Sequence, residues 1–506
     1  MLKIRHSAVI FFVLYGLLIP VLSPEFFQEN IAASLAMIAS CCVIALLFYS
    51  GHALLLNIII AFYVLKQYLV RPFVDIFAGR LDNDQLSYIL GNDSFFNADD
   101  AAVVYISLLS LLSAWLIGLL VSTPKKGKGD VYWIFRRLDE IVSSRNWRLW
   151  LTISLIAIVT YRSPIAMWQS SVGGEAVPLF AFGLFDLSII VYVFFAWFIV
   201  SRRQQLGATY YILLIPVLAS ALVAVAGGAR GALYDIVVFT IIYWAYLNAD
   251  RYIKLGDIKR VVLLSLVVPF VILSGLVAQV VRPLLRSSAF NNTMNLDFGM
   301  LWDTVFLNAN ILNPDNPLLQ TMYFGLTELL HRLSGLREQF LILNDHYVNI
   351  PWETFSPLYS IMRVVNALVP GNLFAGVSNI NQLFHHIYFD ETVVYASHMW
   401  SIQGTLYLYF GFLLSPVIVF GIAMLVGRYN SRLEHLATVS PAFAVFCIFL
   451  FQAVLENGTV ERIIPILVVR PLMNFFLLIT MVNMMYVLFP RTIFMSRARI
   501  RSSGQS

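Results

Sequence analysis

One arginine stands out in the sequence because two apolar runs flank it. The stretch VAVAGGARGALYDIVVF (223–239) carries Arg230 at a turn of small residues, with Asp235 five residues later. The neighbouring glycines permit a tight turn and a close approach of the backbone. The first amides of a helix that follows such a turn favour an anion at the same place. We therefore expect Arg230 to bind an anion, with an interfacial anchor or a pair with Asp235 as the alternative.

Three further arginines could serve the same anion. Arg282 and Arg286 stand four apart in VVRPLLRSS, and Arg363 lies in YSIMRVVNALVP (359–370). A guanidinium offers a planar fork of donors that binds a phosphate or carboxylate through two hydrogen bonds at once. Each of the three could instead be a simple anchor at a membrane surface. The group as a whole predicts a binding site for an anion such as a phosphate or a carboxylate.

Two side chains near the end of a long segment between apolar runs could act as a general base. His398 directly precedes an apolar run, and Glu391 lies seven residues before it. An imidazole or a carboxylate can take the proton from an attacking hydroxyl. The adjacent His385 and His386 would point in different directions on a helix, so we do not expect a metal pair. Because CxxC and HExxH motifs are also absent, we expect no metal, no other cofactor and no disulfide.

The elements that must position these residues are membrane helices. Of the 506 residues, 59% are hydrophobic and only 12% are charged, and the mean hydropathy is +0.79. A soluble domain cannot bury that much apolar surface, and the apolar runs are long enough to cross a bilayer. The chain is therefore expected to be all-α and polytopic, with about twelve spans: 7–22, 31–49, 52–70, 100–122, 149–165, 178–200, 209–227, 231–248, 261–281, 398–426, 440–456 and 463–488.

The distribution of basic residues predicts the orientation of these spans. Strongly basic segments fall on one side of the predicted membrane, which is therefore expected to be cytoplasmic and to hold both termini. These segments are 3–5, 125–148, 202–203, 251–260, 428–432 and 491–501. On the other side only Lys66 is a lysine and every other cation is an arginine. Arginines at the ends of spans are costly to place there and are usually functional.

The predicted organisation has four parts. Residues 1–281 hold nine spans and an acidic outer loop at 71–99, and residues 282–397 form a large outer loop. Residues 398–490 hold three more spans, and 491–506 form a cytoplasmic tail. Within the large loop, 318–343 and 359–370 show apolar residues at helical spacing, and we expect such helices to lie on the outer membrane surface.

Two stretches resemble one family of membrane enzymes. GGARGALYDIVVF is similar to the Gly/Ser-x-Arg-Gly turn of Wzy-type oligosaccharide repeat-unit polymerases, which belong to the wider group that includes O-antigen ligases. SIQGTLYLYFGFLLSPVIVFGIAMLVG (401–427) resembles the late helix of this family, with Gly404, Tyr407, Phe410 and Gly411 in the places of its Gly-x-x-Tyr-x-x-Phe-Gly pattern. The many spans and the single large outer loop before that helix also agree.

The resemblance implies an activity at the outer face of the bacterial inner membrane. Such polymerases move a growing glycan from an undecaprenyl-pyrophosphate carrier onto the sugar of another lipid-linked repeat unit. On this interpretation Arg230, helped by Arg282, Arg286 and Arg363, would hold the pyrophosphate, and His398 or else Glu391 would be the base. The implied partners are these lipid-linked oligosaccharides, membrane lipid, a flippase and a chain-length regulator, with no nucleic acid.

Two other functions stay open at this point. An O-antigen ligase or another lipid-linked sugar transferase would share the outer arginines, and Asp99 with Asp100 could serve such a transferase. We prefer to interpret these acidic residues as the start of a helix, where carboxylates are favoured. A polysaccharide or lipid transporter or flippase would suit twelve spans, but the sequence shows no two-fold repeat.

Overall fold

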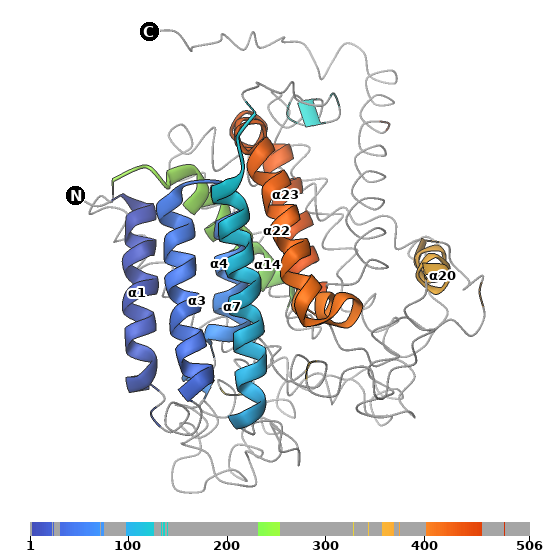
Figure 1. The fold of residues 1–506 in the computed structure, drawn as a ribbon. Helices are drawn as coiled ribbons and strands as arrows, with labels where there is room; N and C mark the ends of the chain where they lie inside the picture. The colour runs from blue at the N-terminus through green and yellow to red at the C-terminus, as the bar shows by residue number, and fades with distance from the viewer. Residues whose placement is uncertain are drawn as a thin grey trace, which may run out of the picture.

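The computed structural model describes six stretches of the chain: 3–22, 31–74 apart from Arg71, 98–125, 231–252, 357–368 and 401–457. It also describes residues 24, 133, 135, 136, 139, 327, 343, 374 and 480. Figure 1 shows the described stretches as helices and the rest as a thin trace. The described stretches contain no strand. An isolated antiparallel bridge joins Lys3 to Tyr252.

The helices fall where the apolar runs predict them. They are α1 (Ile4–Leu22), α3 (Ile31–Ser50), α4 (Leu54–Val64), the π-helical turn η1 (Leu65–Leu69), α7 (Ala98–Val121), α14 (Gly231–Asn248), α20 (Pro357–Leu368), α22 (Ile402–Val439) and α23 (Pro441–Asn457). Within the described residues, five helical segments are long and apolar enough to cross a membrane: Ile4–Leu22, Ile31–Ser50, Leu54–Val74, Ala101–Val121 and Tyr409–Val439. The prediction of a helical membrane protein is confirmed. The predicted spans at 149–165, 178–200, 209–227 and 261–281, and all but one residue of 463–488, lie outside the described residues, as does most of the large loop.

Two predicted spans differ in detail from the observed helices. The span predicted at 398–426 is helical from Ile402 and continues to Val439, so the short basic connector expected after it is one more stretch of helix. The span predicted at 52–70 changes from α-helix to π-helix at Leu65. Hydropathy locates an apolar run, but it carries no information about hydrogen-bond register within the helix.

The helices form a packed bundle. Figure 1 shows α1, α3 and α7 side by side, and contacts run from α1 to α3, from α3 to α7 and from α7 to α22. A second group is made of α4, α14 and α23, which contact one another, and α4 also contacts α3 while α23 contacts α22. Phe239 of α14 stacks on Phe449 of α23 with ring centroids 5.9 Å apart.

Small residues let α7 and α22 approach closely. A methyl group added at Gly118 would lie 2.7 Å from Ala423 Cβ, and one added at Gly427 would lie 1.9 Å from Ser122 Oγ. Gly118 and Ser122 on α7 stand four apart, as do Ala423 and Gly427 on α22, so the two helices run parallel with matched pairs of small residues. In lipid, where apolar surface alone drives no association between helices, such close packing is a main source of helix pairing.

The first amides of α4 are capped by a distant helix. Its N-cap residue, Ala53, has φ 48° and offers no side-chain acceptor. Asn430 Oδ1 accepts from the Ala53 amide at 3.0 Å, and Glu434 Oε1 accepts from the Leu54 amide at 3.0 Å. The start of α4 therefore depends on two side chains of α22, because unpaired amides at a helix start are costly to bury.

A second distant cap begins α23. Ser440 Oγ accepts from the Phe443 amide at 3.2 Å, and Pro441 occupies the first helical position, where its missing N–H costs nothing. Asp139 accepts from the Ala442 amide at 3.0 Å and from the Ser440 hydroxyl. Phe135 packs edge-on against Phe443 at 5.3 Å. Burial raises the pKa of the Asp139 carboxyl to about 6, although both hydrogen bonds act to lower it.

Candidate functional site

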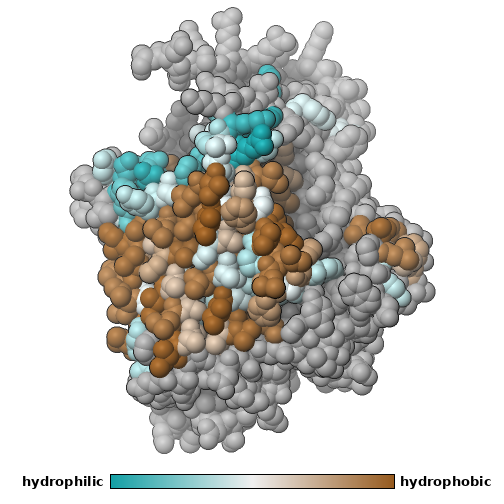
Figure 2. Space-filling model, viewed as in Figure 1, coloured by the Kyte–Doolittle hydropathy of each residue, from teal (hydrophilic) through white to brown (hydrophobic). Residues whose placement is uncertain are grey.

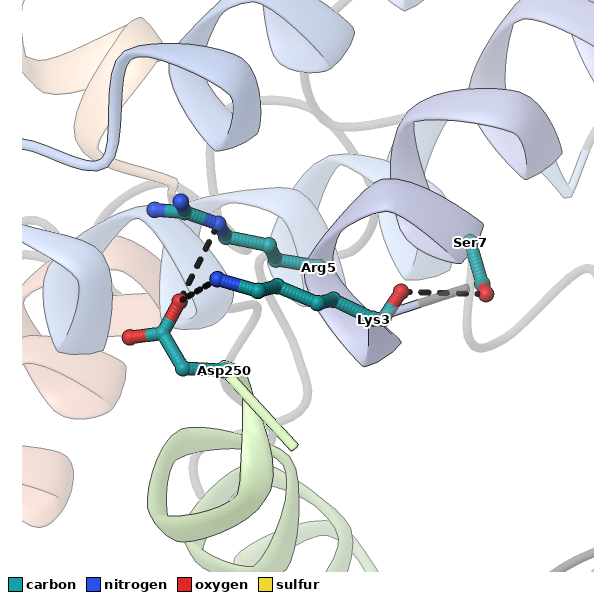
Figure 3. A network of polar contacts seen from close by, with 4 residues as sticks. All are labelled: Lys3, Arg5, Ser7 and Asp250. Carbon is teal, nitrogen blue, oxygen red and sulfur yellow. Dashed lines mark hydrogen bonds and ion pairs between the residues drawn. The ribbon is translucent and has the colours of Figure 1, made fainter. Parts of the chain in front are cut away.

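A cluster of charged residues marks one end of the bundle. Arg5 Nε lies 3.2 Å from Asp250 Oδ1, and Lys3 Nζ lies 3.8 Å from the same oxygen, as Figure 3 shows. The Ile4 amide donates to the Arg251 carbonyl at 3.1 Å. The start of α1 is thereby joined to the residues that follow α14. Both segments belong to the basic set that the sequence assigns to the cytoplasm.

Other members of the same basic set lie at this end. Arg5 reaches the turn before α4, since Arg5 Nη1 lies 2.8 Å from the position of a methyl group at Gly51. That turn is capped by α22, and the Lys125 amide donates to the Arg428 carbonyl of α22 at 2.8 Å. Figure 2 shows hydrophilic side chains gathered at one end of the bundle, next to a broad apolar band. Described segments that were predicted to share one side of the membrane therefore meet in space.

The start of α14 lies away from the charged cluster. This helix has 18 residues and rises by about 27 Å, close to the thickness of a hydrocarbon core. Its C-terminal end lies at the charged cluster, so its first residue, Gly231, lies one helix length away from that cluster. Gly231 directly follows Arg230 in the sequence, and the prediction that a helix starts after the Gly-Arg turn is confirmed.

A buried polar network joins the starts of α22 and α7 to η1. The Gln403 amide nitrogen donates to the Val104 carbonyl at 2.9 Å and to Ser107 Oγ. The Gln403 side-chain oxygen accepts from the Tyr68 hydroxyl. Gln403 is 1% exposed and Tyr68 is 0% exposed, so these bonds form without water. Hydrogen bonds of this kind link helices within a membrane.

Three tyrosines and a serine extend the network. The Tyr407 hydroxyl donates to the Ser107 carbonyl at 3.0 Å and pairs with Ser110 Oγ at 2.8 Å. The Tyr105 hydroxyl donates to the Tyr68 carbonyl at 3.1 Å, and the Tyr63 hydroxyl lies 3.5 Å from that of Tyr68. The π-turn places Tyr68 in this cluster, and such turns are frequent at functional sites.

The start of α22 is shaped by a break in the helix. Gly411 has φ 69° and ψ −178°, a backbone conformation that is essentially restricted to glycine. The Ser415 hydroxyl donates to the Leu406 carbonyl at 2.9 Å and to the Gly411 carbonyl at 2.6 Å, so two carbonyls near the break are satisfied. The turns before the break belong to the polar network, and those after it form the long apolar part of α22.

The network suits positioning rather than proton transfer. Its members are amides and hydroxyls, which hold no charge near neutral pH. Buried polar atoms without a partner also occur close to it in sequence: Gln67 Oε1 and Thr405 Oγ1 have none in the described part of the protein. No three His, Cys, Asp or Glu side chains of the described residues could together hold a metal ion. The network fixes the start of α22, which follows His398 by four residues.

Arg363 is the single predicted site residue that the structure describes in full. Its side chain is 6% exposed, and its guanidinium carbon lies 5.9 Å from the ring centre of Tyr359, one turn earlier on α20. An arginine that only anchors a helix at a membrane surface extends its head group into water. Arg363 therefore lacks the exposure of such an anchor.

The other predicted site residues, Arg230, Arg282, Arg286, Glu391 and His398, lie outside the described residues. Sequence reasoning did not single out Gln403, Tyr68 or Asp139. The sequence did offer one signal for Gln403. It is a glutamine at the start of an apolar run, directly before Gly404 of the Gly-x-x-Tyr-x-x-Phe-Gly pattern. Nothing in the sequence pattern pairs Asp139 with α23, because 301 residues separate it from Ser440.

Comparison of the chain with protein-family models, with curated proteins and with solved structures finds no match. The function must therefore be argued from the residues and contacts of this chain alone.

Proposed function

We propose that the protein is a metal-independent membrane glycosyltransferase that polymerises lipid-linked oligosaccharide repeat units. The carrier would be undecaprenyl pyrophosphate and the site would face the periplasm at the bacterial inner membrane, with both termini in the cytoplasm. The observation that carries the proposal is the placement of α14. Its end is tied to the charged cluster, and its first residue follows the Gly-Arg turn at the other end of a helix of membrane-spanning length.

In the proposed reaction a hydroxyl of the acceptor sugar attacks the anomeric carbon of the donor glycan. The bond from that carbon to the pyrophosphate oxygen breaks, and carrier pyrophosphate leaves with the bonding electrons. The acceptor proton passes to His398, with Glu391 as the alternative base. Arg230, with Arg282, Arg286 and Arg363, would stabilise the negative charge on the leaving group.

The described structure supports this arrangement in two ways. First, amides at the start of α14 would add to the positive field beside Arg230. Second, the buried network around Gln403 holds the start of α22 against α7 and η1, which would limit the movement of the segment that carries His398. A flippase that delivers repeat units and a chain-length regulator are the proposed functional partners.

The test compares the glycans of a deletion strain that carries the wild-type gene, Arg230→Ala or Arg230→Lys. Loss of polymerase activity leaves single repeats on the acceptor, whereas loss of a ligase leaves lipid-linked polymer. We expect single repeats with Arg230→Ala and poor rescue by Arg230→Lys, because an ammonium lacks the two-pronged fork.

The matched control is Arg432→Ala, since Arg432 is an exposed arginine of α22 close to the charged cluster. This variant should support normal polymer. Lipid-linked polymer that accumulates in the deletion strain would show that the protein acts as a ligase and not as a polymerase. Normal polymer from a fully expressed Arg230→Ala protein would reject the role given to Arg230.

A further inference from the structure

Helix α20 has its polarity reversed relative to a helix on the surface of a soluble protein. Leu358 is 60% exposed and Ile361 is 61% exposed, whereas Arg363 is 6% exposed. In water the free energy of transfer would favour the opposite arrangement, with the arginine outside and the aliphatic side chains buried.

The reversal applies to a whole face of the helix. At about 100° per residue, Leu358, Ile361, Met362 and Val365 fall within one apolar arc, and Arg363 falls on the other side. Leu358 and Ile361 are exposed, and Met362 and Val365 are partly exposed. The apolar arc therefore faces outward along the helix, and the side that bears Arg363 faces the protein.

The position of α20 indicates what covers this arc. In Figure 2 its apolar patch lies level with the apolar band of the bundle, away from the hydrophilic end. In Figure 1 α20 is viewed nearly along its axis, whereas α1, α3 and α7 are viewed from the side. A helix that crosses the direction of the spans at the level of the apolar band, with its apolar arc turned outward, is placed to meet the acyl chains of a bilayer.

We propose that α20 is a lipid-binding helix, with Leu358 and Ile361 inserted among the acyl chains of the bilayer and Arg363 turned toward the protein. The lipid in contact is bulk phospholipid, recognised by apolar area rather than by a head group. This proposal does not depend on the reaction that the protein catalyses. It adds that the segment is anchored to the membrane by its own side chains whether or not a lipid-linked substrate is bound.

The experiment measures the surroundings of a nitroxide attached at Ile361→Cys. The full-length protein carries Cys42→Ser as well, because Cys42 is exposed while Cys41 and Cys447 are buried. It is reconstituted into vesicles of phosphatidylethanolamine and phosphatidylglycerol. Relaxation of the label is then measured with oxygen, which concentrates in lipid, and with a water-soluble nickel chelate.

Two reference positions calibrate the result. Leu413→Cys reports lipid, since Leu413 is 87% exposed on the membrane-spanning part of α22. Lys125→Cys reports water, since Lys125 is exposed at the charged end of the bundle. We expect the label at Ile361 to resemble that at Leu413, with at least a several-fold higher ratio of oxygen to nickel accessibility than at Lys125.

Two outcomes would overturn the proposal. A ratio like that of Lys125 would place the arc in water, and low accessibility to both reagents would show that protein covers it. Leu358→Cys provides a second label on the same arc should Ile361→Cys fold poorly. Because Leu358 is itself an exposed side chain, its replacement should leave packing unchanged.

Discussion

The close packing of α7 against α22 makes a quantitative prediction for Gly118→Ala. The added methyl carbon would lie 2.6 Å from the Phe420 carbonyl oxygen and 2.7 Å from Ala423 Cβ. The carbonyl belongs to helix backbone, so the two helices must separate to admit the methyl group. Overpacking of this kind costs about 1–3 kcal/mol. Replacing a helical glycine by alanine returns up to about 1 kcal/mol through helix propensity.

Gly421→Ala is the matched control, because it makes the same chemical change on α22. No heavy atom lies within 4 Å of the methyl group added there. The gain from helix propensity is then common to both variants and cancels in the comparison. The difference in unfolding free energy between them, about 1–3 kcal/mol, therefore reports the overpacking alone. Gly427→Ala should be destabilised as well, since the added methyl group would lie 2.7 Å from Ser122 Cβ, which rotation of the Ser122 side chain does not move.

The assay is reversible unfolding of the purified variants in mixed micelles with increasing mole fraction of sodium dodecyl sulfate, followed by circular dichroism. We expect Gly421→Ala to be the most stable of the three variants, with Gly118→Ala and Gly427→Ala both less stable. Equal stability of the Gly118 and Gly421 variants would refute the parallel contact of α7 and α22. The register of both helices would then need revision.

Three other predictions concern the caps, the polar network and the base. Because the pKa of Asp139 is raised to about 6 in the folded protein, its contribution to stability is greatest at low pH and is lost as the pH rises through 6. Lowering the pH from 7.5 to 5 should stabilise the wild type by about 1 kcal/mol relative to Asp139→Asn, and an identical pH profile for both in thermal unfolding would contradict this. Gln403→Leu and Tyr68→Phe, with their double variant, should give a coupling energy of about 0.6–1.7 kcal/mol in the same unfolding assay, and additive effects would show that the bond contributes nothing. His398→Gln should slow glycan transfer by a factor on the order of 10²–10⁴ while binding of lipid-linked substrate to the purified protein is unchanged, and normal transfer would move the base to Glu391.

Much of the helical layout was predictable because lipid leaves the backbone few choices. Each buried amide and carbonyl must be paired within its own segment, so a long apolar run in a membrane becomes a helix. The apolar run at 31–49 appears as α3 at Ile31–Ser50, and the run at 231–248 appears as α14 with the same bounds. The proposed catalytic and binding residues were chosen by type and spacing, and of these Arg363 lies in the described part.

The basic segments also carried information that the structure bears out in part. Their alternation along the chain predicted that residues near Lys3, Lys125, Arg251 and Arg428 share one side of the membrane. The observed contacts bring these segments together at one end of the bundle. The reason is that a charged side chain is costly within the hydrocarbon, so each helix end places its charges at the nearest membrane surface. This preference depends on the local sequence of that helix end alone.

By itself, the sequence determined that the chain forms apolar helices, where the described ones lie along the chain, and which of the described basic segments lie together. Only the tertiary structure decided how the ends are completed and which way the faces turn. The first amides of α4 are capped by Asn430 and Glu434, and those of α23 by Asp139. The sequence pattern of α20 shows two faces, but the burial of Arg363 shows which one meets the protein. Apolar periodicity is a local property, whereas these caps depend on partners that folding brings from hundreds of residues away.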